Sequence, residues 1–119
     1  MAGRRLRIGI MSQADFQKYT IAIARGKLKR SGQMPKVWFD SVESMAQVLS
    51  SRNRELLRTI QERKPESLKE LASTSGRHVS NLSRTLKTME RYGIVKLQKT
   101  KGAIKPSVRV SSFQAVFGF

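Results

Sequence analysis

Apolar residues recur along this chain at two spacings, one typical of helices and one typical of strands. The clearest helical spacing lies in the second half. Val79, Leu82, Leu86 and Met89 are spaced by three and four residues, and this spacing predicts a helix with one buried face. The residues on the opposite face are polar or basic. The pattern therefore predicts a helix that packs on a core with one side and shows positive charge on the other.

A shorter predicted helix precedes this one. Ser67 is a suitable N-cap, and Glu70 stands three residues later, as in a capping box. The helix ends near Thr74, where Gly76 is free to adopt a left-handed backbone. A short helix, a tight turn and a longer basic helix form the layout of a helix-turn-helix. The alternative is an ordinary helical hairpin whose charged face is solvated.

Two short strands are predicted after the longer helix. Gly93 ends the helix, and apolar residues at 94–97 begin a strand. Residues 99–103 read as the tip of a hairpin. Pro106 lacks an amide donor, so the returning strand belongs at the edge of a sheet. A hairpin in this place is typical of the wing of a winged helix.

The first 39 residues predict a strand, a helix and a second short strand. Residues 4–10 alternate charged and apolar side chains, which indicates a half-buried strand. Ser12 is the predicted cap of a helix that ends near Gly26. A mobile basic loop at residues 25–33 follows, either as a solvated linker or as an arm that contacts phosphate. Residues 37–39 predict the second strand.

Two further helices lead to the helix-turn-helix. Asp40 is the predicted start of the first, with Glu43 at the capping-box position. Ser50 or Ser51 caps the second, which ends before Pro65. In that helix the inward side chains are expected to be Leu56, Leu57 and Ile60.

The expected fold is mainly α with a small β content (α+β), a winged helix-turn-helix with an N-terminal extension. The extension of strand, helix and strand covers residues 1–39, and the DNA-binding domain covers residues 40–112. Residues 113–119 form an apolar C-terminal tail that is too apolar to stay in water. We expect the tail to dock on the domain or on a second subunit.

The charge balance narrows the partners. The chain has 24 Lys and Arg against 8 Asp and Glu, a net charge of +16. Such an excess favours a polyanionic partner. No apolar run of spanning length, secretory signal or lipidation motif is present, so nucleic acid is preferred over a membrane. The expected location is the cytoplasm, in association with the nucleoid.

Enzyme chemistry is disfavoured by the residues at hand. The chain has one histidine and no cysteine, which excludes the usual zinc clusters and the Cys-His dyad. His78 lies at the start of the basic helix, where a role near phosphate fits better than a catalytic triad. No Gly-rich nucleotide loop occurs. We therefore expect no catalytic residue, no metal and no cofactor.

Residues 53–60, 68–72 and 81–95 together resemble a MarR-like winged helix-turn-helix regulator. Residues 7–11, 22–26 and 36–49 are similar to a group of small prokaryotic regulators that are often antitoxins beside a toxin gene. The resemblance implies a transcriptional repressor that controls its own operon. The chain departs from the MarR plan in its strand-helix-strand front end and in lacking long terminal dimerisation helices. The MarR dimer geometry is therefore not carried over.

The candidate DNA contacts fall into three sets. Base readers must lie near the start of the longer helix and point away from the core. These are Ser80, Asn81, Arg84 and Thr85. Phosphate contacts are expected along both helices, at Ser67, Lys69, Arg77, His78, Lys87 and Arg91. The wing adds Lys99, Lys101 and Lys105, whose other role is to protect the hairpin edge.

A single winged helix reads only a few base pairs, so a homodimer on double-stranded operator DNA is expected. Its candidate dimer or partner contacts are Trp38, Phe39, Phe113 and Phe117. The same surface is suited to a cognate toxin. Two alternatives stay open: a non-specific DNA- or RNA-binding protein, and a toxin-neutralising protein for which DNA binding is secondary.

Overall fold

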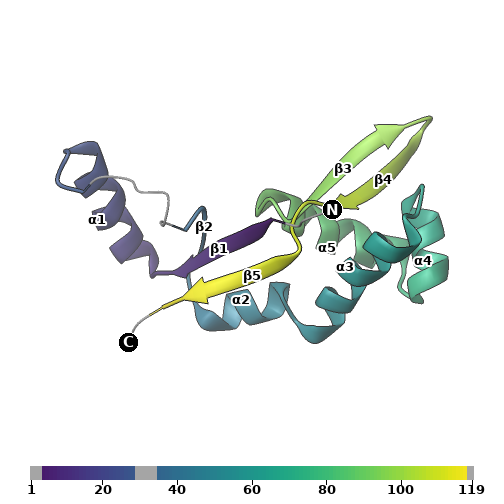
Figure 1. Ribbon diagram of the computed structural model, residues 1–119, viewed down its shortest axis with the longest axis horizontal. Helices are drawn as coiled ribbons and strands as arrows, with labels where there is room; N and C mark the ends of the chain where they lie inside the picture. Colours follow the sequence, from purple (N-terminus) through teal and green to yellow (C-terminus); the bar gives the residue numbers. More distant parts are fainter. Residues whose placement is uncertain (1–3, 29–34, 118–119) are drawn as a thin grey trace.

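The computed structural model describes residues 4–28 and 35–117. Residues 29–33 of the predicted basic loop and Phe119 of the predicted tail lie outside the described residues. The described part is a mixed α/β structure with five helices and five strands, consistent with the expected α+β class. It is elongated, with extents of 49 × 26 × 25 Å, and the two ends differ in construction (Figure 1).

A three-stranded parallel sheet lies at one end. The central strand is β1 (Arg5–Ile10), flanked by β2 (Val37–Phe39) and β5 (Ser112–Val116). In this register Leu6 lies beside Phe113 and Ile8 beside Ala115. The sequence predicted β1 and β2. The apolar tail was expected to dock on the domain or on a second subunit, and its residues 113–116 do lie on the domain, within β5, a strand that the sequence did not predict. Their hydrogen-bonding partner is more than a hundred residues away in sequence, so no local pattern marks the pairing.

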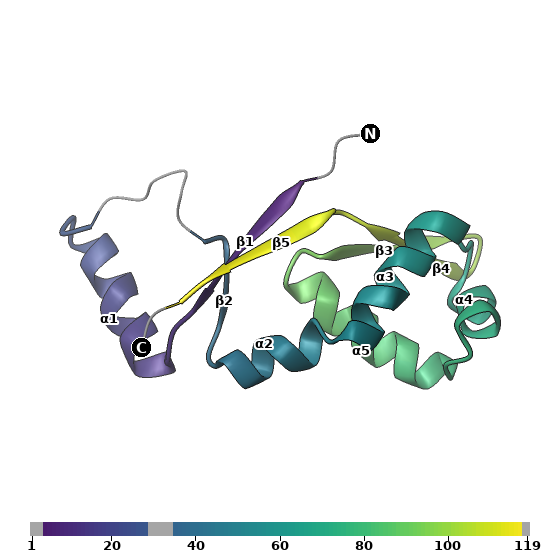
Figure 2. The same ribbon diagram turned by 60° about the horizontal axis from the view of Figure 1, so that its bottom comes forward.

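Helix α1 (Gln13–Ala24) stands apart from the helical half of the molecule (Figure 2). Ser12 caps it as predicted, since its side chain accepts a hydrogen bond of 3.2 Å from the Asp15 N–H. Gly26 follows with a φ of +76°. No residue of α1 is buried. It contacts the sheet through an aromatic cluster in which Tyr19 and Trp38 have ring centroids 5.3 Å apart.

Helices α2 (Val42–Val48) and α3 (Ser51–Arg63) lead to the other end. The cap of α2 is Ser41, whose side chain accepts from the Ser44 N–H at 3.0 Å. The prediction that Asp40 caps this helix is therefore wrong by one residue. Asp40 instead accepts a hydrogen bond from the Ser44 hydroxyl. Ser50 caps α3, one of the two predicted choices.

The helical end contains α4 (Leu68–Ser75), α5 (Val79–Arg91) and a hairpin of β3 (Val95–Thr100) and β4 (Ala103–Val108). Ser67 caps α4, and Gly76 has a φ of +74° in the turn before α5. The hairpin turn is Lys101-Gly102, with both residues at positive φ, so it is tighter than the predicted tip. These elements have the predicted order.

One hydrophobic core joins the two ends. Its members come from the sheet, from α3, α4 and α5, and from the hairpin. The aromatic rings of Phe39 and Tyr92 stack with centroids 4.3 Å apart, which links β2 to the end of α5. The core fixes α5 on one side and leaves its other side to solvent.

Candidate nucleic-acid interface

Helix α5 has its predicted buried face, with one exception. Leu82, Leu86 and Met89 are completely buried. Val79 was expected in the same row, but its side chain is 44% exposed. It occupies the first position of the helix, where no neighbouring element covers it. The apolar spacing therefore begins at Val79, one turn before the first buried residue of the helix, Leu82.

The side of α5 opposite the core carries a row of exposed polar and basic side chains. At 100° per residue, positions separated by three or four residues share a face. We call this row the outer row, and it consists of Ser80, Arg84, Lys87 and Arg91, all exposed. No acidic residue belongs to it. Glu90 points elsewhere, because its carboxylate accepts a hydrogen bond of 3.0 Å from the Leu97 N–H of β3.

Asn81 and Thr85 lie on the flank of α5 rather than in the outer row. Both side chains are half-buried, and both accept hydrogen bonds from Arg77. The Arg77 Nε–H donates to Asn81 Oδ1 at 2.9 Å, and Nη2 donates to Thr85 Oγ1 at 3.2 Å. The four predicted base readers therefore divide into an outward pair, Ser80 and Arg84, and this flanking pair.

Arg77 lies in the turn between α4 and α5 and is held from three directions. Its Nη1 donates to Asn53 Oδ1 on α3 at 3.1 Å, in addition to the bonds to α5. We call these four residues the Arg77 cluster: Arg77, Asn53, Asn81 and Thr85. Burial, and secondarily the charge of Arg52, lower the pKa of Arg77. The guanidinium still carries its charge at neutral pH because its ordinary pKa is so high.

The other predicted phosphate contacts have different surroundings. Lys69 and His78 are exposed. Ser67 is half-buried, and its hydroxyl is used as the cap of α4, 3.0 Å from the Glu70 N–H. Arg91 donates to Thr88 Oγ1 at 3.3 Å. Ser67 is therefore a structural cap first, whereas the exposed basic side chains are available to an anion.

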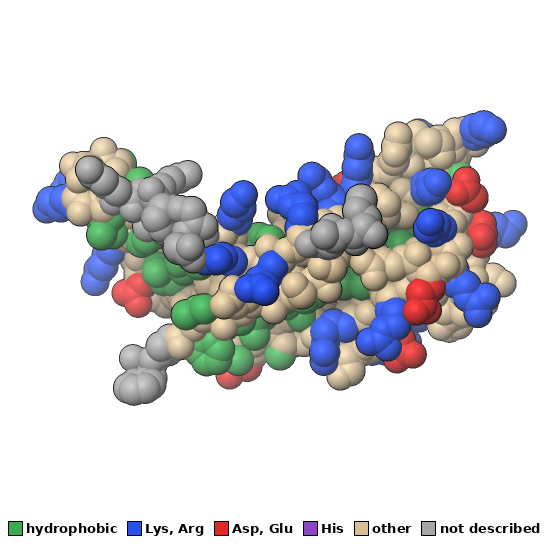
Figure 3. Space-filling model, in the orientation of Figure 1, with side chains coloured by type: hydrophobic (Ala, Val, Ile, Leu, Met, Phe, Trp, Pro, Cys, Tyr) green, Lys and Arg blue, Asp and Glu red, His purple; other side chains and the backbone are tan. Residues whose placement is uncertain are grey.

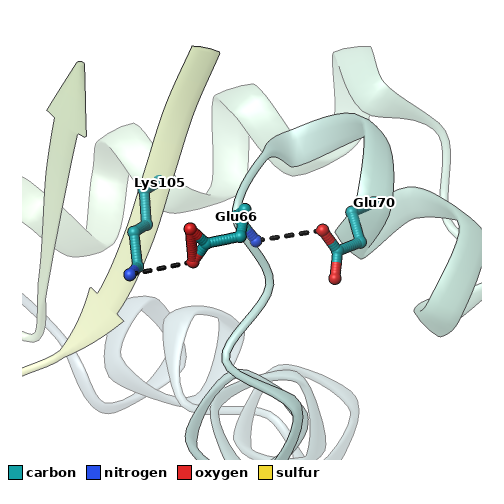
Figure 4. Close-up of polar contacts among 3 residues, drawn as sticks. All are labelled: Glu66, Glu70 and Lys105. Carbon is teal, nitrogen blue, oxygen red and sulfur yellow. Dashed lines mark hydrogen bonds and ion pairs between the residues drawn. The ribbon is translucent and has the colours of Figure 1, made fainter. Parts of the chain in front are cut away.

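The hairpin lysines are not equivalent. Lys99 and Lys101 are exposed, whereas Lys105 forms an ion pair of 2.9 Å with Glu66 (Figure 4). The Glu66 N–H in turn donates to Glu70 at 3.2 Å. The side chain of Glu70 therefore does not close the capping box on the cap residue. The ion pair connects the hairpin to the start of α4.

The four aromatic residues predicted as dimer or partner contacts have different degrees of exposure. Phe39 is only 2% exposed and stacks on Tyr92, so the prediction that it contacts a partner is wrong. Trp38 lies against Gly9, where an added Cβ would overlap its ring. Phe113 packs against the core while partly buried. Phe117 is 53% exposed. Phe39 belongs to the interior because β2 turns alternate side chains to opposite faces of the sheet.

Hydrophobic and basic side chains are distributed differently over one face of the molecule. Figure 3 shows most of the hydrophobic side chains over the sheet and α1, whereas Lys and Arg side chains are spread over the whole of that face. Within the described residues, no group of three metal-ligating side chains gathers. The described helices include none that is both long and apolar enough to cross a membrane.

Asn53 is a residue of this region that the sequence did not single out. Its partner Arg77 is 24 residues away, and no local spacing connects the two. The available signal was weak: an asparagine near the start of a helix whose neighbours are basic.

The fold and the surface together define a small α+β protein with a basic helix-and-hairpin face. A family model named HVO_A0114 matches residues 48–115, more than half of the chain, and the chain belongs to the HVO_A0114 family. The matched segment begins at the last residue of α2 and ends within β5, so it contains the outer row, the Arg77 cluster and the hairpin. No curated protein matches the chain, and no solved structure does.

Proposed function

We propose that this chain is a sequence-specific double-stranded DNA-binding transcriptional regulator. In this proposal α4, the turn at Gly76 and α5 form a helix-turn-helix, and the β3–β4 hairpin is its wing. The observation that carries the proposal is the outer row of α5, which is exposed, contains three basic side chains and has no acid. A helix of this width fits the major groove of B-DNA.

Arg84 is the best candidate for base reading. It lies in the second turn of α5, faces away from the core and is exposed. An arginine there has the reach and planar fork needed for a bidentate pairing with guanine. Ser80, one turn earlier, adds a hydroxyl that donates or accepts. Lys87 and Arg91 lie further along, where phosphates flank the groove.

The remaining affinity comes from charge. Residues 50–119 contain fifteen Lys and Arg against five acids, a net charge of +10, and residues 1–49 contain nine against three, a net charge of +6. Each phosphate contact releases counterions, so binding weakens as salt rises. Lys99 and Lys101 on the wing extend the basic surface to flanking phosphates.

The proposal includes a two-fold homodimer, because one winged helix reads only a few base pairs. The sheet end is the candidate contact, since its exposed apolar residues lie away from the outer row. Among them are Ile21, Val116 and Phe117. The antitoxin role stays a prediction that depends on the resemblance. A toxin would compete for the same surface.

Non-specific nucleic-acid binding is the second candidate, and the net charge of +16 favours it. The two candidates differ in their preference among duplexes. Specific sites are typically ~10³–10⁷-fold tighter than non-specific ones. A footprint on the chain's own upstream DNA, compared with a scrambled duplex of equal composition, separates them.

The decisive variant is Arg84→Ala, which should lose ~1–3 kcal/mol of discrimination between the footprinted and scrambled duplexes. Lys18→Ala on α1 is the matched control, because it removes a positive charge far from the outer row. If wild-type protein binds both duplexes equally, the sequence-specific proposal is wrong. If Arg84→Ala weakens both duplexes equally, Arg84 contacts phosphate only.

A further inference from the structure

The start of α5 is held differently from the start of every other described helix. A serine side chain caps each of α1, α2, α3 and α4, at Ser12, Ser41, Ser50 and Ser67. The N-cap of α5 is His78, which makes no side-chain capping bond. The first turns of α5 therefore lack the usual local anchor, although they carry the residues proposed to read DNA.

The Arg77 cluster provides an anchor from outside the helix. One guanidinium donates to Asn81 and Thr85, which lie one turn apart on α5, and to Asn53 on α3. All three acceptors are neutral, so the contact is not an ion pair. A planar fork with fixed donors restricts rotation of α5 about its axis relative to α3.

Asn53 is itself immobilised. Its Nδ2 donates to the carbonyl oxygens of Gln47 and Val48 at 3.2 and 3.1 Å. Its backbone N–H donates to the Ser50 side chain at 3.2 Å. These bonds use both amide hydrogens and leave Oδ1 facing Arg77. The end of α2, the start of α3 and the first turns of α5 are thus joined in one chain of hydrogen bonds.

We propose that Arg77 is a positioning residue that sets the orientation of α5 on α3, and thereby which groups the outer row presents to DNA. Asn81 and Thr85 serve as its acceptors on α5 and do not read bases. The inference rests on the proposed DNA-binding function and names the residues that give it specificity without touching DNA. It also reassigns Arg77 from the phosphate contacts expected from sequence.

The test compares the full-length wild type with Arg77→Lys and Asn53→Ala. Arg77→Lys keeps the charge but cannot bridge three acceptors with a planar fork. Arg63→Lys is the matched control, since it makes the same change at an exposed arginine at the end of α3, outside the outer row and the Arg77 cluster. The probes are a duplex selected from a random pool by wild-type protein and a scrambled duplex of equal composition. Affinity is measured by fluorescence anisotropy over a salt series.

Arg77→Lys and Asn53→Ala are each expected to lower the ratio of selected to scrambled affinity by about tenfold. The salt dependence should stay unchanged in Arg77→Lys, because no phosphate contact is lost. Arg63→Lys should keep both quantities. The double variant should lose little more than either single variant, because the two residues act through one network.

A second measurement needs no DNA. Amide hydrogen exchange at residues 79–85 should be faster in Arg77→Lys and Asn53→Ala than in wild type and Arg63→Lys. The fluorescence of Trp38, at the sheet end, should not change. This readout separates the two proposals. Faster exchange in a protein that shows no duplex preference supports the positioning role and ends the sequence-specific function.

Two results overturn the inference. One is unchanged exchange at residues 79–85 in Arg77→Lys. The other is an Arg77→Gln variant whose salt slope falls by about one while its duplex preference persists, which identifies Arg77 as a phosphate contact.

Discussion

Helices α1 and α5 are nearly equal in length, yet the chain uses them in opposite ways. Helix α5 buries Leu82, Leu86 and Met89 completely, whereas α1 buries no residue. In α5 the apolar residues form a single row, so one core accommodates them all. In α1, Phe16 faces the Trp38 ring while Ile21 lies on the other side and is 50% exposed.

The difference shows what a single apolar row does. It commits a helix to a fixed orientation, and the side opposite the row becomes a defined surface. A helix that is apolar on two sides satisfies only one of them within its own chain. The helical end of this protein therefore presents one defined surface, and the sheet end is where additional contacts are expected.

The largest expected effect on the free energy of unfolding comes from replacing one apolar residue of each helix by alanine. Leu86→Ala should lower the free energy of unfolding by ~2–5 kcal/mol, because it opens a cavity in the shared core. Ile21→Ala should change it by less than about 0.5 kcal/mol. Urea denaturation measures both. Similar losses in the two variants would contradict the comparison and indicate that α1 is covered in solution.

The next effect concerns the contact that holds α1 to the sheet. Gly9→Ala places a methyl group against the Trp38 ring and should cost ~1–3 kcal/mol through overpacking. Trp38 is the only tryptophan, so its fluorescence reports the change directly. Combining Gly9→Ala with Trp38→Leu should recover part of the loss. A fully additive double variant would show that the ring is not the obstacle.

Removing the serine caps of α1 and α4 tests the same difference between the two ends of the molecule, with a smaller expected loss of stability. Ser67→Ala removes the cap of α4, whose Leu71 is completely buried, and should lower the free energy of unfolding by about 1 kcal/mol. Ser12→Ala should lower it less, because α1 frays without disturbing the core. Thermal melts followed by circular dichroism measure both losses. Equal shifts would mean that α1 unfolds together with the helical end.

The smallest effect separates two lysines of the hairpin. Lys99→Gln should lower the slope of log affinity against log salt by about 0.9 if Lys99 neutralises one phosphate. Lys105→Gln should lower it less, because Lys105 is engaged with Glu66. Salt titrations with the duplex selected by wild-type protein give both slopes. Equal slopes for the two variants would show that the ion pair opens when DNA binds.

Local spacing predicted most helix starts. Ser12 and Ser67 were recognised, and Ser50 was one of two choices with Ser51, because a cap acts on an amide three residues away. Helix α2 was placed one residue early because Asp40 and Ser41 are both good caps with plausible partners. Only the observed bond to Ser44 separates them.

The candidate interface was predicted only in part, for a geometric reason. The apolar period identified the buried side of α5 and therefore placed Arg84 outward. It did not reveal that Asn53 of α3 and Arg77 of the α4–α5 turn lie against the flank of α5, where Asn81 and Thr85 accept the hydrogen bonds of Arg77. Contacts between residues far apart in sequence leave no periodic pattern from which they could be predicted.

The sequence by itself determined the order of the elements from β1 to β4, the caps Ser12 and Ser67, the buried row of α5 and the excess of positive charge, because these depend on neighbours within a few residues. The tertiary structure alone decided that residues 112–116 pair with β1, that Phe39 is interior and that Arg77 joins α3 to α5. Each of these depends on which distant segments the shared core brings together, and that choice is made by the packing of the whole chain.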